Sequence, residues 1–228
     1  MDGKHVGKTG VKTVAGEYMI AIGDSITAGT NSTFITPLSQ DNYAAYLSKR
    51  MGYKLFNLAY PMATSRSALS QAKRMEEIAR HRGRKAALAV VMIGANDVFR
   101  NRPAKEFEEN LSHIVAAAKK CSNKVVVLGL PDLRHFSGIR SRSAPFFHAI
   151  YGAIGMKVLS PATWKRFDQF DRIIRNVAKR NKVYFVDVHA HSFSKEDLGV
   201  DRLHAGRRGH VRISEYIYRM LSKSKGRK

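Results

Sequence analysis

Four polar side chains stand just beyond hydrophobic runs of the sequence, where a buried chain would reach the surface. Ser25 follows one such run directly after Asp24, and Asn96 follows the longest run of the chain. Asp201 and His204 come after the last run. Acyl transfer uses a hydroxyl, a side-chain amide, a carboxylate and an imidazole as nucleophile, oxyanion donor, orienting group and base. These residue types therefore indicate acyl-transfer chemistry.

Each of these signals also has a purely structural interpretation. Ser25 suits a helix cap after a strand, and Asn96 suits a turn. The spacing of Asp201 and His204 is common in loops. Placement is more informative, because ligands of an open parallel sheet bind beyond the carboxyl ends of its strands. If all four residues follow strands, they share one edge of the sheet.

Short runs rich in Val, Ile and Leu alternate with longer amphipathic segments along the chain. The short runs predict strands at Met19–Gly23, Lys54–Asn57, Ala87–Ile93, Lys124–Gly129 and Val183–Val188. The amphipathic segments predict helices at Asp41–Met51, Ser65–Arg82, Ala104–Cys121, Ala162–Arg180 and about Gly209–Ser222. This alternation is typical of a parallel sheet with helices on both faces.

The sequence contains no internal repeat and no low-complexity linker, so we expect a single domain over residues 1–228. A polar tail, 1–17, and a basic tail, 223–228, flank it. The segment 131–160 is too long for an ordinary connection. It is either a lid or acyl-pocket wall or a small satellite core, and the two interpretations are compatible. Its candidate pocket residues are Phe136, Phe146, Phe147 and Tyr151.

The polar blocks resemble those of the SGNH hydrolases, the esterase and lipase superfamily also called GDSL, in the family's order from about residue 19 to 210. The matching blocks are Gly23-Asp24-Ser25-Ile26, Gly94-Ala95-Asn96-Asp97 and Asp201-Arg202-Leu203-His204. The resemblance implies a three-layer α/β/α sandwich with a five-stranded parallel sheet of flavodoxin-like order. That order puts the first and third strands side by side, so Ser25 and Asn96, which follow them, are expected to be neighbours.

The resemblance also implies a role for each site residue. Ser25 is expected to be the nucleophile, His204 the base and Asp201 the group that orients His204. The oxyanion hole is expected to combine the backbone N–H groups of Ser25 and Ala59 with the side-chain amide of Asn96. Ala59 stands where the family usually has glycine. Since alanine resists positive φ, a hole of slightly altered geometry is expected.

The function implied is hydrolysis of carboxylic esters, of small molecules or lipids, through an acyl-enzyme and without a metal or organic cofactor. An acyltransferase or a carbohydrate deacetylase on the same triad is an alternative, and so is a non-catalytic polyanion-binding protein of this fold. Asp24, Asp97 and His210 are interpreted as structural residues. His189 and His191 have a metal-like spacing but no evident third ligand, so no metal site is predicted.

Charge and hydropathy limit the partners. A net charge of +22 favours non-specific contact with anionic surfaces or polyanions, but no specific nucleic-acid module accompanies it. The longest apolar run, residues 86–95, is too short to span a bilayer, so no transmembrane segment is predicted. The polar N-terminus has no signal-like apolar stretch. A cytoplasmic location is therefore expected, or a secreted one if a leader was trimmed.

Overall fold

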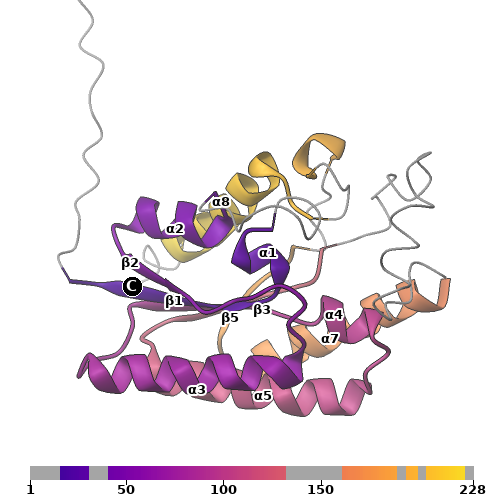
Figure 1. Cartoon of the computed structure of the whole chain (residues 1–228), viewed down its shortest axis with the longest axis horizontal. Helices are drawn as coiled ribbons and strands as arrows, with labels where there is room; N and C mark the ends of the chain where they lie inside the picture. The colour runs from indigo at the N-terminus through magenta and orange to yellow at the C-terminus, as the bar shows by residue number, and fades with distance from the viewer. Residues whose placement is uncertain (1–15, 31–40, 132–160, 189–193, 200–203, 224–228) are drawn as a thin grey trace, which may run out of the picture.

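The computed structural model describes residues 16–30, 41–131, 161–188, 194–199 and 204–223. Its five strands form one parallel sheet in the order β2-β1-β3-β4-β5 (Figure 1). The predicted parallel sheet and its flavodoxin-like order are confirmed. The strands are β1 (Tyr18–Gly23), β2 (Lys54–Asn57), β3 (Leu88–Met92), β4 (Val125–Leu128) and β5 (Tyr184–Val186).

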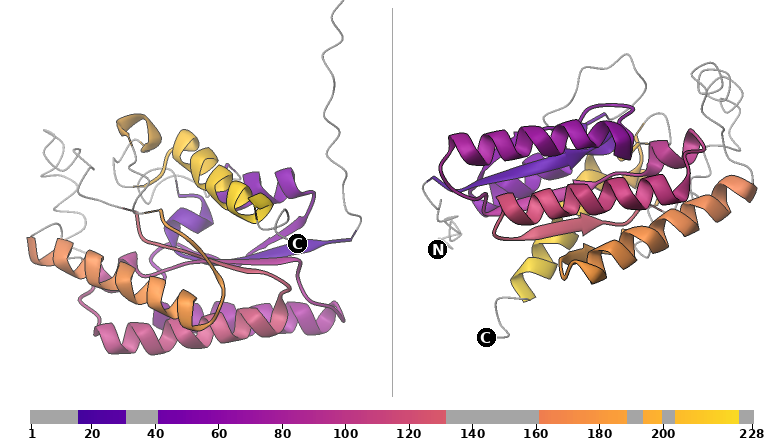
Figure 2. Two further views of the ribbon diagram at one scale, coloured as in Figure 1. Left: turned by 180° about the vertical axis from the view of Figure 1, so that it is seen from behind. Right: turned by 90° about the horizontal axis from the view of Figure 1, so that it is seen from below.

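Helices cover both faces of the sheet, as the two further views show (Figure 2). One face carries α3 (Ser65–His81), α5 (Ala104–Cys121) and α7 (Pro161–Arg180). The other face carries α2 (Tyr43–Met51) and α8 (Arg207–Lys223). These are the five predicted helices, with ends that differ by a few residues.

The side chains of β1 show how the core divides. Ile20 and Ile22 belong to the core under α3, α5 and α7. Met19 and Ala21 belong to the core under α2 and α8. Alternate residues of a strand point to opposite faces of the sheet. An entirely apolar strand such as β1 therefore contributes side chains to both cores.

Within the described ranges, the sequence did not predict three short elements: α1 (Ser25–Ala28), α4 (Ala95–Phe99) and the 3₁₀ helix η3 (Lys195–Asp197). Each is too short to show a periodic pattern. The helix α1 begins directly after β1, and α4 begins directly after β3. The 3₁₀ helix η3 precedes α8 in the chain.

Gly23 closes β1 where the sheet leaves room for no side chain. A Cβ at this position would lie 2.2 Å from Thr27 Oγ1 and 2.6 Å from the carbonyl oxygen of Met92. The buried Gln71 fixes the same residue: its Oε1 accepts from Gly23 N at 2.9 Å, and its Nε2 donates to Gly23 O at 2.9 Å. The start of α1 is thus held against β3 and α3.

We expect Gly23→Ala to lower the free energy of unfolding by about 2–4 kcal/mol, because the new methyl group meets the buried Thr27 side chain and the backbone oxygen of Met92. Gly83→Ala is the matched control. Gly83 has a φ of +61° and no atom within 4 Å of the added Cβ. Its substitution carries only the conformational cost, about 1 kcal/mol. Urea unfolding of both variants checks this, and an equal loss at the two positions would contradict the steric argument.

Candidate active site

Ser25 and His204 are in hydrogen-bond contact although 179 residues separate them in the chain, with 2.9 Å between Ser25 Oγ and His204 Nε2. Ser25 is the first residue of α1, and His204 lies just before α8. Both side chains are half-buried. A hydroxyl bonded to an imidazole nitrogen at this distance is the arrangement in which histidine can take the serine proton.

Tyr43, the first residue of α2, contacts both α1, which carries Ser25, and α8, which follows His204. Its Oη shares a hydrogen bond of 2.8 Å with Thr27 Oγ1 on α1. Its backbone N–H donates to His210 Nδ1 on α8 at 3.3 Å, and the two rings stack. All three side chains are buried. His210 is a packed residue of the first turn of α8, as predicted.

The backbone around His204 is held by a short antiparallel bridge between Leu198 and Ala205. Gly199 N donates to His204 O at 2.8 Å, and Gly206 N donates to Asp197 O at 2.8 Å. The predicted orienting residue, Asp201, lies outside the described residues.

Asn96 occupies the first turn of α4 and is buried. Its Nδ2 donates to the carbonyl oxygen of Ala63 at 2.9 Å, in the loop between β2 and α3. The next residue, Asp97, accepts from Ser65 N at 2.8 Å and from Ser65 Oγ at 2.6 Å. Asn96 therefore lies beside the β2–α3 loop, and Asp97 is structural, as predicted.

Ala59, predicted to alter the oxyanion hole because alanine resists positive φ, lies in the β2–α3 loop without a positive φ. The N–H of Ala59 donates to Asn57 Oδ1 at 3.2 Å. The described non-glycine residues with positive φ are Met62, Asn101 and Lys182, so Ala59 is not strained in that way. Met62, three residues later, has a φ of 66°. Sequence reasoning missed it because methionine gives no signal for this conformation, which costs free energy for any residue with a Cβ.

Two ionisable groups near the pair have strongly shifted pKa values. Burial raises the pKa of Asp24 to about 7, although its Oδ1 accepts from Ile26 N at 3.2 Å. This contact gives Asp24 the structural role that was predicted. Burial, with a smaller contribution from the nearby His204, lowers the pKa of His210 to about 4. Burial penalises the charged form of both groups, so the shifts have opposite signs.

These opposite shifts act on stability in opposite directions between about pH 4 and pH 6.5. In this window native Asp24 keeps a proton that the unfolded chain has lost, so its contribution to stability falls as pH rises. Native His210 lacks a proton that the unfolded chain holds, so its contribution rises with pH.

Asp24→Asn, which keeps an oxygen for the Ile26 N–H, should leave only the His210 contribution of this pair. Relative to the wild type, its free energy of unfolding is expected to increase by about 2 kcal/mol between pH 4.5 and pH 6. His210→Gln should change by a similar amount in the opposite direction. Urea unfolding across this range measures both, and parallel curves for the three proteins would refute the linkage.

Other predicted residues lie outside the described part of the chain. They are the pocket residues Phe136, Phe146, Phe147 and Tyr151 and the histidines His189 and His191. The terminal tails and the 131–160 segment are likewise almost wholly outside it. Among the described residues, no helix has the length and apolar character needed to cross a membrane.

Comparison with known proteins identifies the family. The model of the GDSL-like lipase/acylhydrolase family matches residues 21–212. No curated protein matches the chain. Among solved structures, the lipase/acylhydrolase from Enterococcus faecalis is 19% identical with a TM-score of 0.65, covering 91% of this chain and 96% of its own. The acetylxylan esterase Axe2 from Geobacillus stearothermophilus is 20% identical with a TM-score of 0.62, covering 92% and 96%.

TesA is similar to the same extent, with 20% identity and a TM-score of 0.62 over 90% of this chain and 98% of its own. At such identities the structures establish a shared fold and no shared substrate. The family match spans the chain from β1 to α8 and includes both Ser25 and His204. The chain belongs to the GDSL-like lipase/acylhydrolase family, the hydrolases of the SGNH fold.

Proposed function

We propose that the protein hydrolyses carboxylic esters through an acyl-enzyme, with Ser25 as nucleophile, His204 as base and Asp201 as the residue that orients His204. The observation that carries this proposal is the 2.9 Å contact between Ser25 Oγ and His204 Nε2. It lies at the carboxyl edge of the sheet, where ligands of this architecture bind. Membership of an acylhydrolase family supports the reaction class.

The proposed reaction follows from this contact. His204 Nε2 accepts the proton of Ser25 Oγ while the oxygen attacks the acyl carbon. The tetrahedral adduct collapses when His204 returns the proton to the leaving alcohol oxygen. Water then attacks the acyl carbon and gives a proton to His204. The second adduct collapses by breaking the bond between the acyl carbon and Ser25 Oγ, His204 returns the proton to Oγ, and the carboxylic acid leaves.

The negative oxygen of the adduct needs donors. Ser25 is the first residue of α1, so its N–H has no acceptor within the helix. Asn96 Nδ2 uses one hydrogen on Ala63 O, which leaves its other hydrogen for a ligand. Ala59 stays the predicted third donor. Met62 is a second candidate, because its strained backbone is typical of functional sites and its N–H donates to no acceptor among the described residues.

The substrate is proposed only as a class. The apolar residues of the 131–160 segment favour an acyl chain, and the net charge of +22 favours an anionic ester or interface. Axe2, a structural neighbour, is an acetylxylan esterase, which keeps carbohydrate deacetylation as a second candidate. Product analysis separates hydrolysis from acyl transfer to an alcohol and from polyanion binding without catalysis.

Ser25→Ala and His204→Ala should each lower the turnover of p-nitrophenyl esters by roughly 10⁴–10⁶. Esters from acetate to a long acyl chain also report the preferred chain length. A serine-reactive fluorophosphonate should label the wild type and not Ser25→Ala. Turnover that survives in Ser25→Ala would break the assignment. Heparin binding by a wild type that neither turns over nor labels would favour the binding protein.

The third oxyanion donor can be identified by backbone substitutions. Met62→Val should lower kcat by about 10²–10³ without raising KM, because a β-branched residue resists the φ of 66° that directs this N–H. Met62→Gly should keep kcat. Lys182→Val is the matched control, since Lys182 has a φ of 54° and precedes β5. If Met62→Val keeps kcat while Ala59→Pro, which removes an N–H, loses it, Ala59 is the donor.

A further inference from the structure

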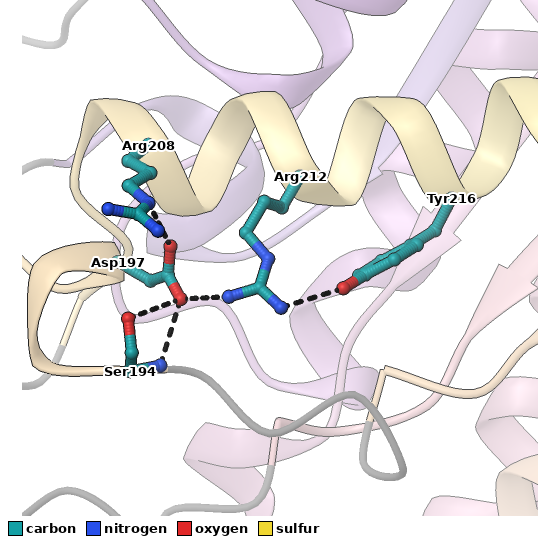
Figure 3. A network of polar contacts seen from close by, with 5 residues as sticks. All are labelled: Ser194, Asp197, Arg208, Arg212 and Tyr216. Atoms are coloured by element: carbon teal, nitrogen blue, oxygen red, sulfur yellow. Dashed lines mark hydrogen bonds and ion pairs between the residues drawn. The ribbon is translucent and has the colours of Figure 1, made fainter.

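A buried carboxylate between η3 and α8 makes four polar contacts (Figure 3). Asp197 in η3 has no exposed side-chain surface. One of its oxygens accepts from Ser194 N at 2.8 Å, from Ser194 Oγ at 2.9 Å and from Arg212 Nη1. The other lies 3.3 Å from Arg208 Nε. Arg212 also donates to Tyr216 Oη at 3.0 Å, so α8 itself holds its guanidinium in place.

This carboxylate joins two segments that bracket the base. Asp197 lies before His204 in the chain, and Arg208 and Arg212 follow it on α8. The backbone carbonyl of Asp197 accepts from Gly206 N. Two residues after Asp197, Gly199 N donates to His204 O. The side chain of Asp197 thus fixes η3 to α8, and its main-chain carbonyl holds Gly206, two residues after His204.

The ion pair with Arg212 is the contact that decides the position. A fully buried carboxylate needs charged or multiple polar partners, and its loss of one partner is costly. Arg212 is one-third exposed and is held by Tyr216, whereas Arg208 is 64% exposed. Exposed partners contribute little. Asp197 and Arg212 are therefore the pair on which the spacing of η3 and α8 depends.

There is almost no space for this arrangement to shift. A Cβ at Gly206 would lie 2.7 Å from the carbonyl oxygen of Leu198. The backbone of Gly206 therefore packs directly against that of Leu198, with no room for a side chain between them. Catalytic groups must be held within about half an ångström of the productive geometry, and a shift of about 1 Å can cost about 10²-fold in rate.

We propose that Asp197, paired with Arg212, is a positioning residue that sets His204 against Ser25. The inference rests on the proposed function, because the position of His204 matters for catalysis only if His204 is the base. Asp197 acts through the main chain and does not touch the substrate. Its effect is on the rate at which Ser25 is activated.

The test measures the rate and the final extent of fluorophosphonate labelling in Asp197→Asn, Arg212→Met and the double variant. Arg212→Met keeps an unbranched apolar stem, so it provides a second route if Asp197→Asn does not fold. Arg219→Met is the matched control, because Arg219 forms an exposed ion pair with Glu215 on the same helix. Steady-state kinetics with a short p-nitrophenyl ester accompany the labelling.

Each single variant should label completely but about 10–100-fold more slowly, with kcat lowered in proportion and KM unchanged. The double variant should be no slower than the slower single variant, since the two side chains act as one unit. Arg219→Met should behave as the wild type. Variants that are less stable yet label at the wild-type rate would overturn the inference alone. A wild type that does not label would overturn the proposed function and, with it, this inference.

Discussion

The close approach of β1 and β3 at Gly23 is the constraint on which the candidate site depends. No side chain fits there, and α1 begins two residues later with Ser25, which therefore lies at the edge of the sheet. The hydroxyl of Thr27 fills the space that a Cβ at Gly23 would need. The same hydroxyl forms a hydrogen bond with Tyr43, which connects α1 to α2. Tyr43 in turn contacts His210 on α8, the helix that follows His204. A steric limit on one strand is thus transmitted through buried polar contacts to both members of the pair.

Buried carboxylates near this edge differ in the partners of their charge, as Asp197, Asp97 and Asp24 show. The carboxylate of Asp197 forms ion pairs with Arg208 and Arg212 and accepts a hydrogen bond from Ser194. Asp97 has the hydroxyl and the N–H of Ser65, and burial still raises its pKa. Asp24 caps α1 through a single N–H, and its pKa rises to about 7. Asp97 and Asp24, whose described hydrogen-bond partners are neutral, bind a proton more tightly than an exposed carboxylate does.

Much of the fold could be predicted from the sequence, because apolar runs covered on both faces are unambiguous in composition and the strand order follows from the family resemblance. Ser25, Asn96 and His204 could be named because they directly follow such runs or belong to the blocks that match the family. What could not be predicted has no local signal. The left-handed backbone of Met62 carries no glycine, and α1 and α4 are shorter than the period that reveals a helix.

The role proposed for Asp197 was missed for a different reason. Its partner Arg212 lies on α8, and only the packed structure brings η3 against that helix. An acidic residue in a basic chain gives no indication of which arginine it meets. Long-range ion pairs of this kind depend on tertiary packing, which periodicity and composition do not encode.

The separation of Ser25 and His204 by 179 residues bears on how the protein acquires its activity. The contact between them is among the most non-local that a chain of this length can make, and non-local contacts form late because loop closure must come first. A folding intermediate in which β1, β3 and their helices have assembled would still lack its base until α8 docks on α2. Recovery of serine reactivity during refolding would then report the final docking of α8, whereas most of the secondary structure would already have formed.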